Sequence, residues 1–331
     1  MMNMAKGKEA TCLSAATIKE KYLNSIFIVL LLIGAPFFFL GGPEYHSSRS
    51  LHAAWDLGHI LYFFLGSCLL CIYLRKINPV RSFLWIFFLT FCIVFFVGFS
   101  VEVLQMFCDG RTPDVFDVLR DQLGCLTAFA FIIHPVLFGK QWQQHLFRGM
   151  VLMLLAIAVW PLSRSLLDEY LAAQQFPVLA DFETPFEQYR WVDMQFLSEE
   201  TGKVRHGKNA ARVQLSTAQY SGISLFHFPG DWQGYQTLRF SVYNPKTANL
   251  VLNCRIHDVH HKEHHLAYDD RFNQQFTLQQ GWNDMVISLE KVKTALRGRI
   301  MDMQHIEGFG LFVMQQPSPL EIYLDHVYLS K

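Results

Sequence analysis

Long apolar stretches with few charges fill the first half of the sequence. Segments 22–42 and 82–101 carry no charged side chain, and 57–74 has none besides one histidine. The charges of 115–139 fall in its first turns, and those of 147–166 lie near its ends. About 20 consecutive apolar residues span the hydrocarbon core of a bilayer. These segments therefore predict an all-α transmembrane bundle of about five spans.

The second half of the sequence has a different pattern. From residue 180 onward, short alternating segments are separated by Gly, Pro, Asn and Asp. Alternation with a period of two is typical of strands with one buried face, and regular turn signals favour a sandwich. We expect strands in the segments ARVQL, GISLF, TLRFSVY, LVLNCRI, QFTL, DMVISL, GFGLFVM and EIYLDHVYL. The predicted fold class is multi-domain, with transmembrane helices followed by an all-β jelly-roll sandwich.

These two patterns set the expected domain boundaries. A polar tail at 1–21 precedes a four-span domain at 22–139, a fifth helix at 140–167, a linker at 168–178 and the sandwich at 179–331. The average of 51% hydrophobic residues conceals this division. The first apolar run is too long for a signal peptide and has no small-residue cleavage site, so we expect it to be retained.

The distribution of Lys and Arg predicts how the spans are oriented. With the N-terminus in the cytoplasm, the cytoplasmic flanks hold the lysines of the tail together with Arg75, Lys76 and Arg81. Fewer basic residues flank the opposite ends, and cytoplasmic loops are enriched in Lys and Arg. An odd number of spans then places the C-terminal sandwich in the periplasm or outside the cell.

Polar side chains gather where the third span ends and the fourth begins. Within 100–124, Glu102 and Gln105 share one helix face, and Asp117 and Asp121 share another. The second span opens with an aspartate and a histidine on the same side of the membrane. Charges at the ends of spans are costly and by default mark a functional or pairing site. The candidate catalytic cluster is Asp56, His59, Glu102, Gln105, Arg111, Asp117 and Asp121.

This cluster has a chemical and a structural interpretation. A carboxylate desolvated beside a histidine can act as a general base, and the planar fork of Arg111 can hold a phosphate or carboxylate. Alternatively, Glu102 and Arg111 form only an ion pair that fixes the turn, and His59 only packs. We expect Asp114 to suit the positive end of the fourth helix, and Arg120 to pair with a neighbouring aspartate.

The polar residues of the membrane half, in combination, resemble a known family. The carriers are WDLGH at 55–59, Glu102-x-x-Gln105, Gly110-Arg111, Asp117 and Gly124. This pattern is similar to that of the VanZ-like membrane proteins over 23–138, although the family tends to have asparagine where this chain has Asp121. Gly124 and Ala128 are expected to permit close helix contact. The resemblance implies a bacterial envelope protein of the cytoplasmic membrane with relatives linked to glycopeptide (teicoplanin) tolerance.

The second half resembles jelly-roll carbohydrate-binding modules of the galactose-binding type over most of 179–329. The carriers are DFE at 181–183, DW at 231–232, YNP at 243–245, GWN at 281–283 and YLDHV at 323–327. In many such modules a calcium ion binds where the first and last strands meet, and Glu183 and Asp325 match that position. Carboxylate oxygens suit calcium. The resemblance therefore implies sugar binding and calcium as a possible cofactor.

Histidines are concentrated in one segment of the second half, at 257–265. Their spacing matches no closed site for zinc or copper, so the segment either binds a metal in another way or is a solvated connection. A further interpretation is a polar rim that contacts sugar hydroxyls beside an aromatic ring. The candidate ligand-binding residues are His257, Asp258, Asp270, Arg271, Asn273, Trp232 and Tyr268.

Together these features predict a membrane protein whose exported sandwich binds an envelope glycan or lipid-linked glycan beside the bilayer. A second hypothesis is a membrane enzyme that acts on a lipid-linked glycan or a phospholipid headgroup, but no serine–histidine pairing, HExxH or P-loop names a reaction. A third is a membrane anchor whose sandwich recruits a protein partner. The zero net charge, with no basic face, argues against nucleic-acid binding.

Overall fold

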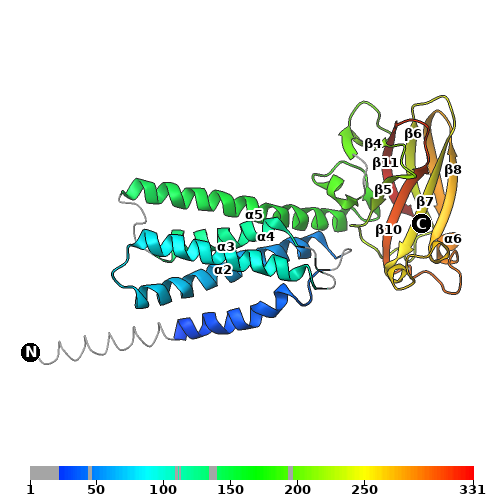
Figure 1. Cartoon of the computed structure of the whole chain (residues 1–331). Coiled ribbons are helices and arrows are strands. Elements are labelled where there is room, and N and C mark those ends of the chain that lie inside the picture. Colours follow the sequence, from blue (N-terminus) through cyan, green and yellow to red (C-terminus); the bar gives the residue numbers. More distant parts are fainter. Residues whose placement is uncertain (1–21, 44–46, 109–110, 112, 134–139, 193–196) are drawn as a thin grey trace, which may run out of the picture. The chain divides into compact units, whose positions relative to one another are not determined.

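The computed structural model describes residues 22–43, 47–108, 111, 113–133, 140–192 and 197–331. By its internal contacts the chain divides into two compact units, Met1–Ser163 and Arg164–Lys331. Figure 1 colours the helical part blue to green and the sandwich green to red. The expected cytoplasmic tail at 1–21 and Gly110 of the family pattern lie outside the described residues.

Apolar helices form the first part of the chain. They are Tyr22–Phe38, which ends in the 3-10 segment η1 (Ala35–Phe38), α2 (Arg49–Ile77), α3 (Phe83–Gln105), α4 (Val115–Phe131) and α5 (Gln141–Gln175) (Figure 1). Ser48 and Ser82 cap α2 and α3, because each side chain accepts a hydrogen bond from a first-turn N–H. Asp114 caps α4 in the same way, with its Oδ1 accepting from Phe116 N at 2.9 Å. Asp114 thus lies at the positive end of the helix as expected, and in the structure it is the N-cap residue itself.

Three of these helices, α2, α3 and α5, are long and apolar enough to cross a membrane. The helix Tyr22–Phe38 is shorter, and α4 has 17 residues. The expectation of a helical bundle with about five helices is confirmed, and the described residues provide three candidate spans. Of the fourth expected span, 115–139, α4 forms the part Val115–Phe131, and residues 134–139 lie outside the described residues.

Helix α4 packs closely against α2 and α3. A Cβ on Gly124 would lie 2.4 Å from the carbonyl oxygen of Ile60 and 2.9 Å from the backbone nitrogen of Phe64, so a side chain there would clash with α2. On α3, Gly98 leaves space for the carboxylate of Asp121. The expected close helix contact at Gly124 is confirmed, and it brings the acidic face of α4 against both neighbours.

Helix α5 extends beyond the expected span 147–166. It continues to Gln175, so most of the expected linker at 168–178 is helical, and the boundary between the compact units falls inside this helix. Asp168 is fully buried and accepts a hydrogen bond from Arg190 Nη2 at 2.9 Å. The polar character of this stretch therefore includes a buried ion pair as well as solvent-exposed side chains.

The second unit contains two antiparallel sheets. One sheet has the order β3-β4-β11-β6-β9 with β1 paired to β11, and the other has the order β2-β5-β10-β7-β8. The strands are β1 (Val178–Ala180), β2 (Trp191–Val192), β3 (Leu197–Glu200), β4 (Ala210–Leu215), β5 (Tyr220–Leu225), β6 (Thr237–Asn244), β7 (Leu250–Asp258), β8 (Phe272–Leu278), β9 (Gly281–Ser288), β10 (Ile306–Met314) and β11 (Leu320–Ser330). Every segment expected to be a strand lies largely within β4 to β11. The predicted all-β sandwich is confirmed.

Short helices complete this unit: η2 (Glu187–Arg190), η3 (Val259–Lys262), η4 (Tyr268–Asp270) and α6 (Leu289–Lys293). The core between the sheets contains Leu252 and Ile256 of β7, Phe309 of β10 and Phe240 of β6. Because successive side chains of a strand point to opposite faces, the neighbours of these residues face outward. The outer face of β5-β10-β7-β8 is thereby available to solvent and carries one of the sites described below.

Candidate functional site

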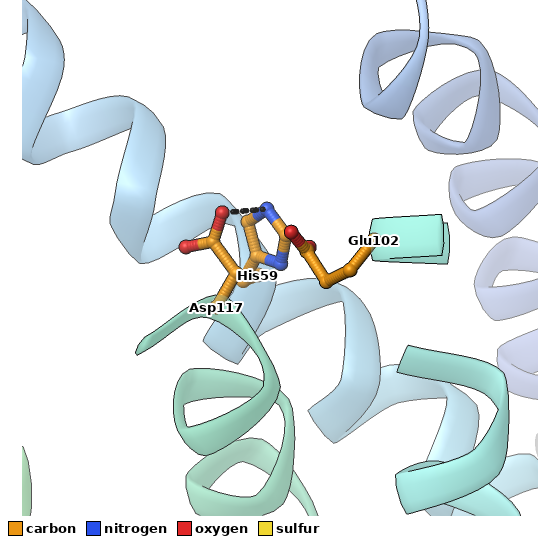
Figure 2. A group of neighbouring side chains, drawn as sticks. All are labelled: His59, Glu102 and Asp117. Atoms are coloured by element: carbon orange, nitrogen blue, oxygen red, sulfur yellow. Dashed lines mark ion pairs between the residues drawn. The ribbon is translucent and has the colours of Figure 1, made fainter. Parts of the chain in front are cut away.

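The ends of α2, α3 and α4 bring polar residues of the membrane half together. His59 comes from α2, Glu102 from the last turn of α3 and Asp117 from the first turn of α4, and Figure 2 shows the imidazole between the two carboxylates. One ligand atom from each residue lies within 4.8 Å of the others. His59 and Glu102 are buried, and Asp117 is mostly so. The cluster is therefore a compact group with little access to water.

Both ring nitrogens of His59 face carboxylates. Nδ1 lies 2.9 Å from Asp121 Oδ1, and Nε2 lies 3.4 Å from Asp117 Oδ2. The ring also packs edge-on against Phe38, with centroids 4.9 Å apart. His59 therefore packs, as one interpretation expected, and in addition it is held by charged partners on both sides.

Glu102 and Asp117 each have one oxygen fixed by a group other than His59, whereas Asp121 Oδ2 is buried without a hydrogen-bond partner among the described residues. Glu102 Oε2 accepts a hydrogen bond from Asp114 N at 2.7 Å, and Asp117 Oδ1 accepts one from Arg120. Glu102 Oε1 is buried and has no hydrogen-bond partner among the described residues. One oxygen of Glu102 thus remains available in a site where a buried polar atom normally has a partner.

Arg120 connects this cluster to the N-terminal end of α2. Its Nη2 lies 2.8 Å from Asp56 Oδ2, and its Nη1 lies 3.3 Å from Asp114 Oδ2 in addition to the contact with Asp117. The expected pairing of Arg120 with a neighbouring aspartate is confirmed. The side chains of Asp56 and Asp114 are 42% and 43% exposed, so these two residues lie at the rim of the cluster.

The two remaining polar residues predicted for this cluster contact the end of the first helix. Arg111 Nη2 donates to the carbonyl of Phe37 at 2.5 Å, and Gln105 Nε2 donates to the carbonyl of Phe38 at 2.9 Å. An ion pair between Arg111 and Glu102, one of the alternatives, is not among the contacts of the described residues. Arg111 and Gln105 therefore hold the first helix against α3 in this structure.

A second candidate site is a groove of about 500 Å³ on the outer face of the sheet β5-β10-β7-β8. Its lining combines aromatic rings, amides and guanidinium groups. The residues that give this character are Tyr220, Tyr268, Phe312, Asn253, Asn273, Gln275, Arg255 and Arg271. No Asp or Glu belongs to the described lining, so the groove carries positive charge.

Arg255 lies across the sheet in this groove. Its Nη2 donates to Ser224 Oγ at 2.9 Å on β5, two strands away. On the intervening strand β10, a Cβ at Gly310 would lie 2.7 Å from Arg255 Nε and 3.0 Å from its Cγ. Glycine at this position therefore leaves room for the side chain to cross β10.

Arg271 lies at the end of the groove near the start of β8. Its guanidinium sits 5.3 Å from the ring centre of Tyr268, and its Nε donates to Asn273 Oδ1 at 3.1 Å. Burial lowers the pKa of Arg271, and the positive charge of Arg255 lowers it further. Two guanidinium groups therefore face the same groove, where an anion would offset their mutual repulsion.

The structure separates the residues predicted to bind a sugar. Tyr268, Arg271 and Asn273 line the groove. The others are buried and lie outside its lining: Trp232, His257, Asp258 and Asp270. Sequence reasoning missed Arg255 and Asn253, although their period-two spacing on β7 placed them together on an outward face.

Asp258 and Asp270 belong to an ion-pair network with Arg299. Arg299 Nη2 donates to Asp258 Oδ1 at 2.8 Å, and its Nε donates to Asp270 Oδ1 at 2.6 Å. Burial alone would raise the pKa of Asp258, but hydrogen bonds from Arg299 and from Asp302 N hold it below its ordinary value. Hydrogen bonds from Arg299 also lower the pKa of Asp270, and His261 contributes to this effect. These contacts indicate a structural role.

The two residues considered for calcium both hold the loop 205–209. Glu183 Oε1 accepts two backbone N–H groups of this loop at 2.5 and 2.8 Å, and Asp325 Oδ2 accepts two more at 2.6 and 2.8 Å. Asp325 Oδ1 is buried without a hydrogen-bond partner among the described residues. Burial raises the pKa of Asp325. An unsatisfied carboxylate oxygen fits an oxygen-preferring cation, whereas Glu183 Oε1 already has its partners.

Part of the membrane half matches a known protein family. Residues 15–138 match the VanZ/LLP1 family model. The resemblance expected from the sequence is confirmed for this region. No match was found among curated proteins.

The sandwich region is similar to several solved structures. The family 11 carbohydrate-binding module from Clostridium thermocellum, in complex with a β-1,3-1,4-mixed-linked tetrasaccharide, is 15% identical, with 46% of this chain and 94% of that chain covered and a TM-score of 0.35. An exo-β-agarase is 13% identical, with 46% and 24% covered and a TM-score of 0.37. Xylanase 10B from Clostridium thermocellum is 11% identical, with 46% and 28% covered and a TM-score of 0.32.

Proposed function

We propose that this membrane protein, whose residues 15–138 match the VanZ/LLP1 family, binds an acidic glycan of the cell envelope in the groove of its β-sandwich. The observation that carries the proposal is the groove itself, in which Arg255 and Arg271 face the same space as the exposed ring of Tyr268. The bound glycan would be a free envelope polysaccharide or the sugar part of a lipid-linked precursor.

The groove combines the two kinds of contact that a charged sugar needs. Tyr268 is 69% exposed, so the face of its ring is available to an apolar patch of a pyranose. Guanidinium groups pair with carboxylate or phosphate through two parallel hydrogen bonds, and amides such as that of the exposed Gln275 can contact hydroxyls. The groove volume of about 500 Å³ also falls within the range of small-ligand sites.

We further propose the orientation predicted by the basic flanks, with the N-terminus in the cytoplasm and the sandwich in the periplasm or outside the cell. In that arrangement the protein lies in the cytoplasmic (inner) membrane of a bacterium and holds its glycan beside the bilayer. Tolerance to glycopeptide antibiotics would then follow from altered access to envelope precursors. A reporter fused after Lys331 and active only outside the cytoplasm tests this orientation.

Binding of the full-length protein in lipid nanodiscs to a panel of polysaccharides tests the groove. We expect retention of carboxylated or phosphorylated glycans and much weaker retention of neutral ones. Arg271→Gln should weaken binding about tenfold, because one charge-assisted hydrogen bond contributes roughly 1.5 kcal/mol. Arg239→Gln is the matched control, because Arg239 is an exposed arginine on β6 of the other sheet.

Two results would contradict this function. One is equal affinity for neutral and acidic glycans, and the other is unchanged binding by Arg271→Gln when circular dichroism shows that both variants are folded. Retention of no glycan together with a specific crosslinked protein would favour the membrane-anchor hypothesis.

The cluster at His59 supports a second candidate function, turnover of a lipid-linked glycan or a phospholipid headgroup. The specific observation in its favour is the buried Glu102 Oε1 without a partner, next to an imidazole held by carboxylates. Incubation of nanodisc-bound protein with envelope lipid extracts, followed by mass spectrometry, tests this function with Glu102→Gln as the inactive variant. If no product is found whose formation requires Glu102, this second function is ruled out.

A further inference from the structure

We propose that His59, Glu102 and Asp117 bind a divalent transition-metal ion, with zinc and manganese as the fitting elements. The three residues come from three different helices, yet one ligand atom of each lies within 4.8 Å of the others (Figure 2). Zinc and manganese accept imidazole nitrogen together with carboxylate oxygen, whereas magnesium and calcium prefer oxygen ligands alone.

The first argument is the way in which each residue is anchored. His59 Nδ1 is held by Asp121, which leaves Nε2 directed towards Asp117. Glu102 Oε2 is held by the N–H of Asp114, and this leaves Oε1 as the oxygen that can bind the metal. Partners on the far atom of each ligand are typical of metal sites, where they fix the tautomer and the orientation of the ring.

Asp117 follows the same arrangement. Its Oδ1 accepts a hydrogen bond from Arg120, so that Oδ2 remains on the side of His59 Nε2, 3.4 Å away. The three proposed donor atoms are therefore His59 Nε2, Glu102 Oε1 and Asp117 Oδ2. In each residue the other ring nitrogen or carboxylate oxygen is already held by a neighbouring group. The remaining coordination positions would be available to water or to a substrate oxygen, as in metal sites that keep an open position.

The second argument is the unsatisfied atom. Glu102 is 6% exposed, and its Oε1 has no hydrogen-bond partner within the described part of the chain. A buried carboxylate oxygen without a partner is costly, since the charged group has lost its water and gained nothing in return. A cation at the centre of the three residues would satisfy this oxygen.

The third argument is the charge balance of the cluster. Five carboxylates lie in or beside the cluster, those of Asp56, Glu102, Asp114, Asp117 and Asp121. Among the described residues, the guanidinium that pairs with members of this group is that of Arg120, which contacts Asp56, Asp114 and Asp117. Excess negative charge in a poorly solvated site requires compensation, and a divalent cation supplies two positive charges at once. Protonation of His59 without any metal is the alternative, and it would supply one.

Metal titration of the purified full-length protein in lipid nanodiscs distinguishes the two. The exposed histidines of the segment 257–265 must first be removed as competing ligands, with His260→Gln, His264→Gln and His265→Asn in every sample. Asparagine is chosen at 265 because the backbone there has φ 58°, which asparagine tolerates. Cobalt serves as the spectroscopic probe, and zinc and manganese are then used in competition with it.

We expect one equivalent of cobalt with visible ligand-field absorption that zinc displaces. Glu102→Gln should abolish the absorption, while its amide oxygen can still accept the N–H of Asp114. Asp121→Asn changes a positioning residue and should weaken affinity roughly 10- to 100-fold without removing a ligand. His145→Gln, an exposed histidine on α5 of the same unit, should leave the titration unchanged.

An ion-pair cluster with protonated His59 predicts a different outcome. Binding of cobalt, zinc and manganese would then be absent, or it would be the same in Glu102→Gln as in the parent, and either result overturns the proposal. Should Glu102→Gln fail to fold, Asp121→Asn decides, since unchanged affinity in that variant contradicts the ligand geometry. This test of metal binding does not depend on glycan binding, because the titration contains no glycan.

Discussion

Arg299 illustrates how single residues of the sandwich separate structural from binding roles. It is 19% exposed and joins Asp258, at the end of β7, to Asp270, just before β8. Breaking such a network leaves buried carboxylates without their partner, which is far more costly than losing a surface ion pair. The residue therefore fixes the loop beside the groove, and Arg255 and Arg271 are the arginines of the groove lining.

The pH dependence of stability follows from the same residues. Arg299 holds the pKa values of Asp258 and Asp270 below their ordinary value. A lowered pKa in the folded state gives stability that is complete above the unfolded value, about 4, and is lost as pH falls through the folded values. We expect the sandwich to lose stability below about pH 4 for this reason.

Arg299→Gln should remove this contribution. At pH 7 we expect the free energy of unfolding to fall by roughly 3 kcal/mol. The decrease in this free energy between pH 5 and pH 3 should also be smaller than in the parent protein. Hydrogen exchange of the β7 and β10 amides, corrected for intrinsic rates, measures both effects in the full-length protein. Arg239→Gln should change neither, and an unaltered pH profile in Arg299→Gln would contradict the assignment.

At this scale the sequence predicted part of the polar cluster of the membrane half, but Gln105 and Arg111 contact the end of the first helix instead. Helical spacing placed Glu102 and Asp117 at neighbouring helix ends. It could not show that Glu102 accepts the N–H of Asp114, or that Arg111 turns towards the carbonyl of Phe37. Spacing gives the face of a helix, whereas the partner of each side chain depends on how far the helices slide along one another.

Among the elements, the last strand and the loop 205–209 carry the proposed calcium site. Asp325 lies on β11, and its Oδ1 is the buried oxygen without a partner among the described residues. A cation that binds only the folded state at 100 times its Kd would add about 2.7 kcal/mol to the free energy of unfolding. We expect calcium to raise the unfolding temperature of the sandwich, and chelator to lower it.

Asp325→Asn should abolish this response to calcium. Asp269→Asn, an exposed aspartate in η4, should retain it. Differential scanning calorimetry with calcium and with chelator makes the comparison in full-length protein. An identical unfolding temperature under both conditions in the parent chain would mean that Asp325 Oδ1 holds no calcium.

Elements differed in how well they could be predicted. Strands β4 to β11 followed from alternation, because one face of each is buried against Phe309 or its neighbours. Strands β1 and β2 are too short for alternation to be visible. The extension of α5 to Gln175 was missed because a polar stretch suggests a linker, while Asp168 is in fact buried against Arg190, a partner distant in sequence.

For the whole molecule, the two candidate sites lie in separate compact units. If the sandwich captures a glycan so that the membrane unit can act on it or sense it, both sites belong to one process. When two residues act in one process, the effects of substituting them do not add. The effects of substitutions at independent sites do add. A double variant therefore tests whether this chain has one function or two.

Glu102→Gln and Arg271→Gln should each change the sensitivity of cells to a glycopeptide antibiotic at normal protein level, since each impairs one proposed site. In one shared process the double variant should be no more affected than the stronger single variant, because loss of either step already stops it. Arg239→Gln should match the parent. Additive effects would indicate two unconnected functions, and unchanged sensitivity in every variant would detach both sites from glycopeptide tolerance. Immunoblots of membrane fractions ensure that a change in sensitivity reflects the sites and not protein abundance.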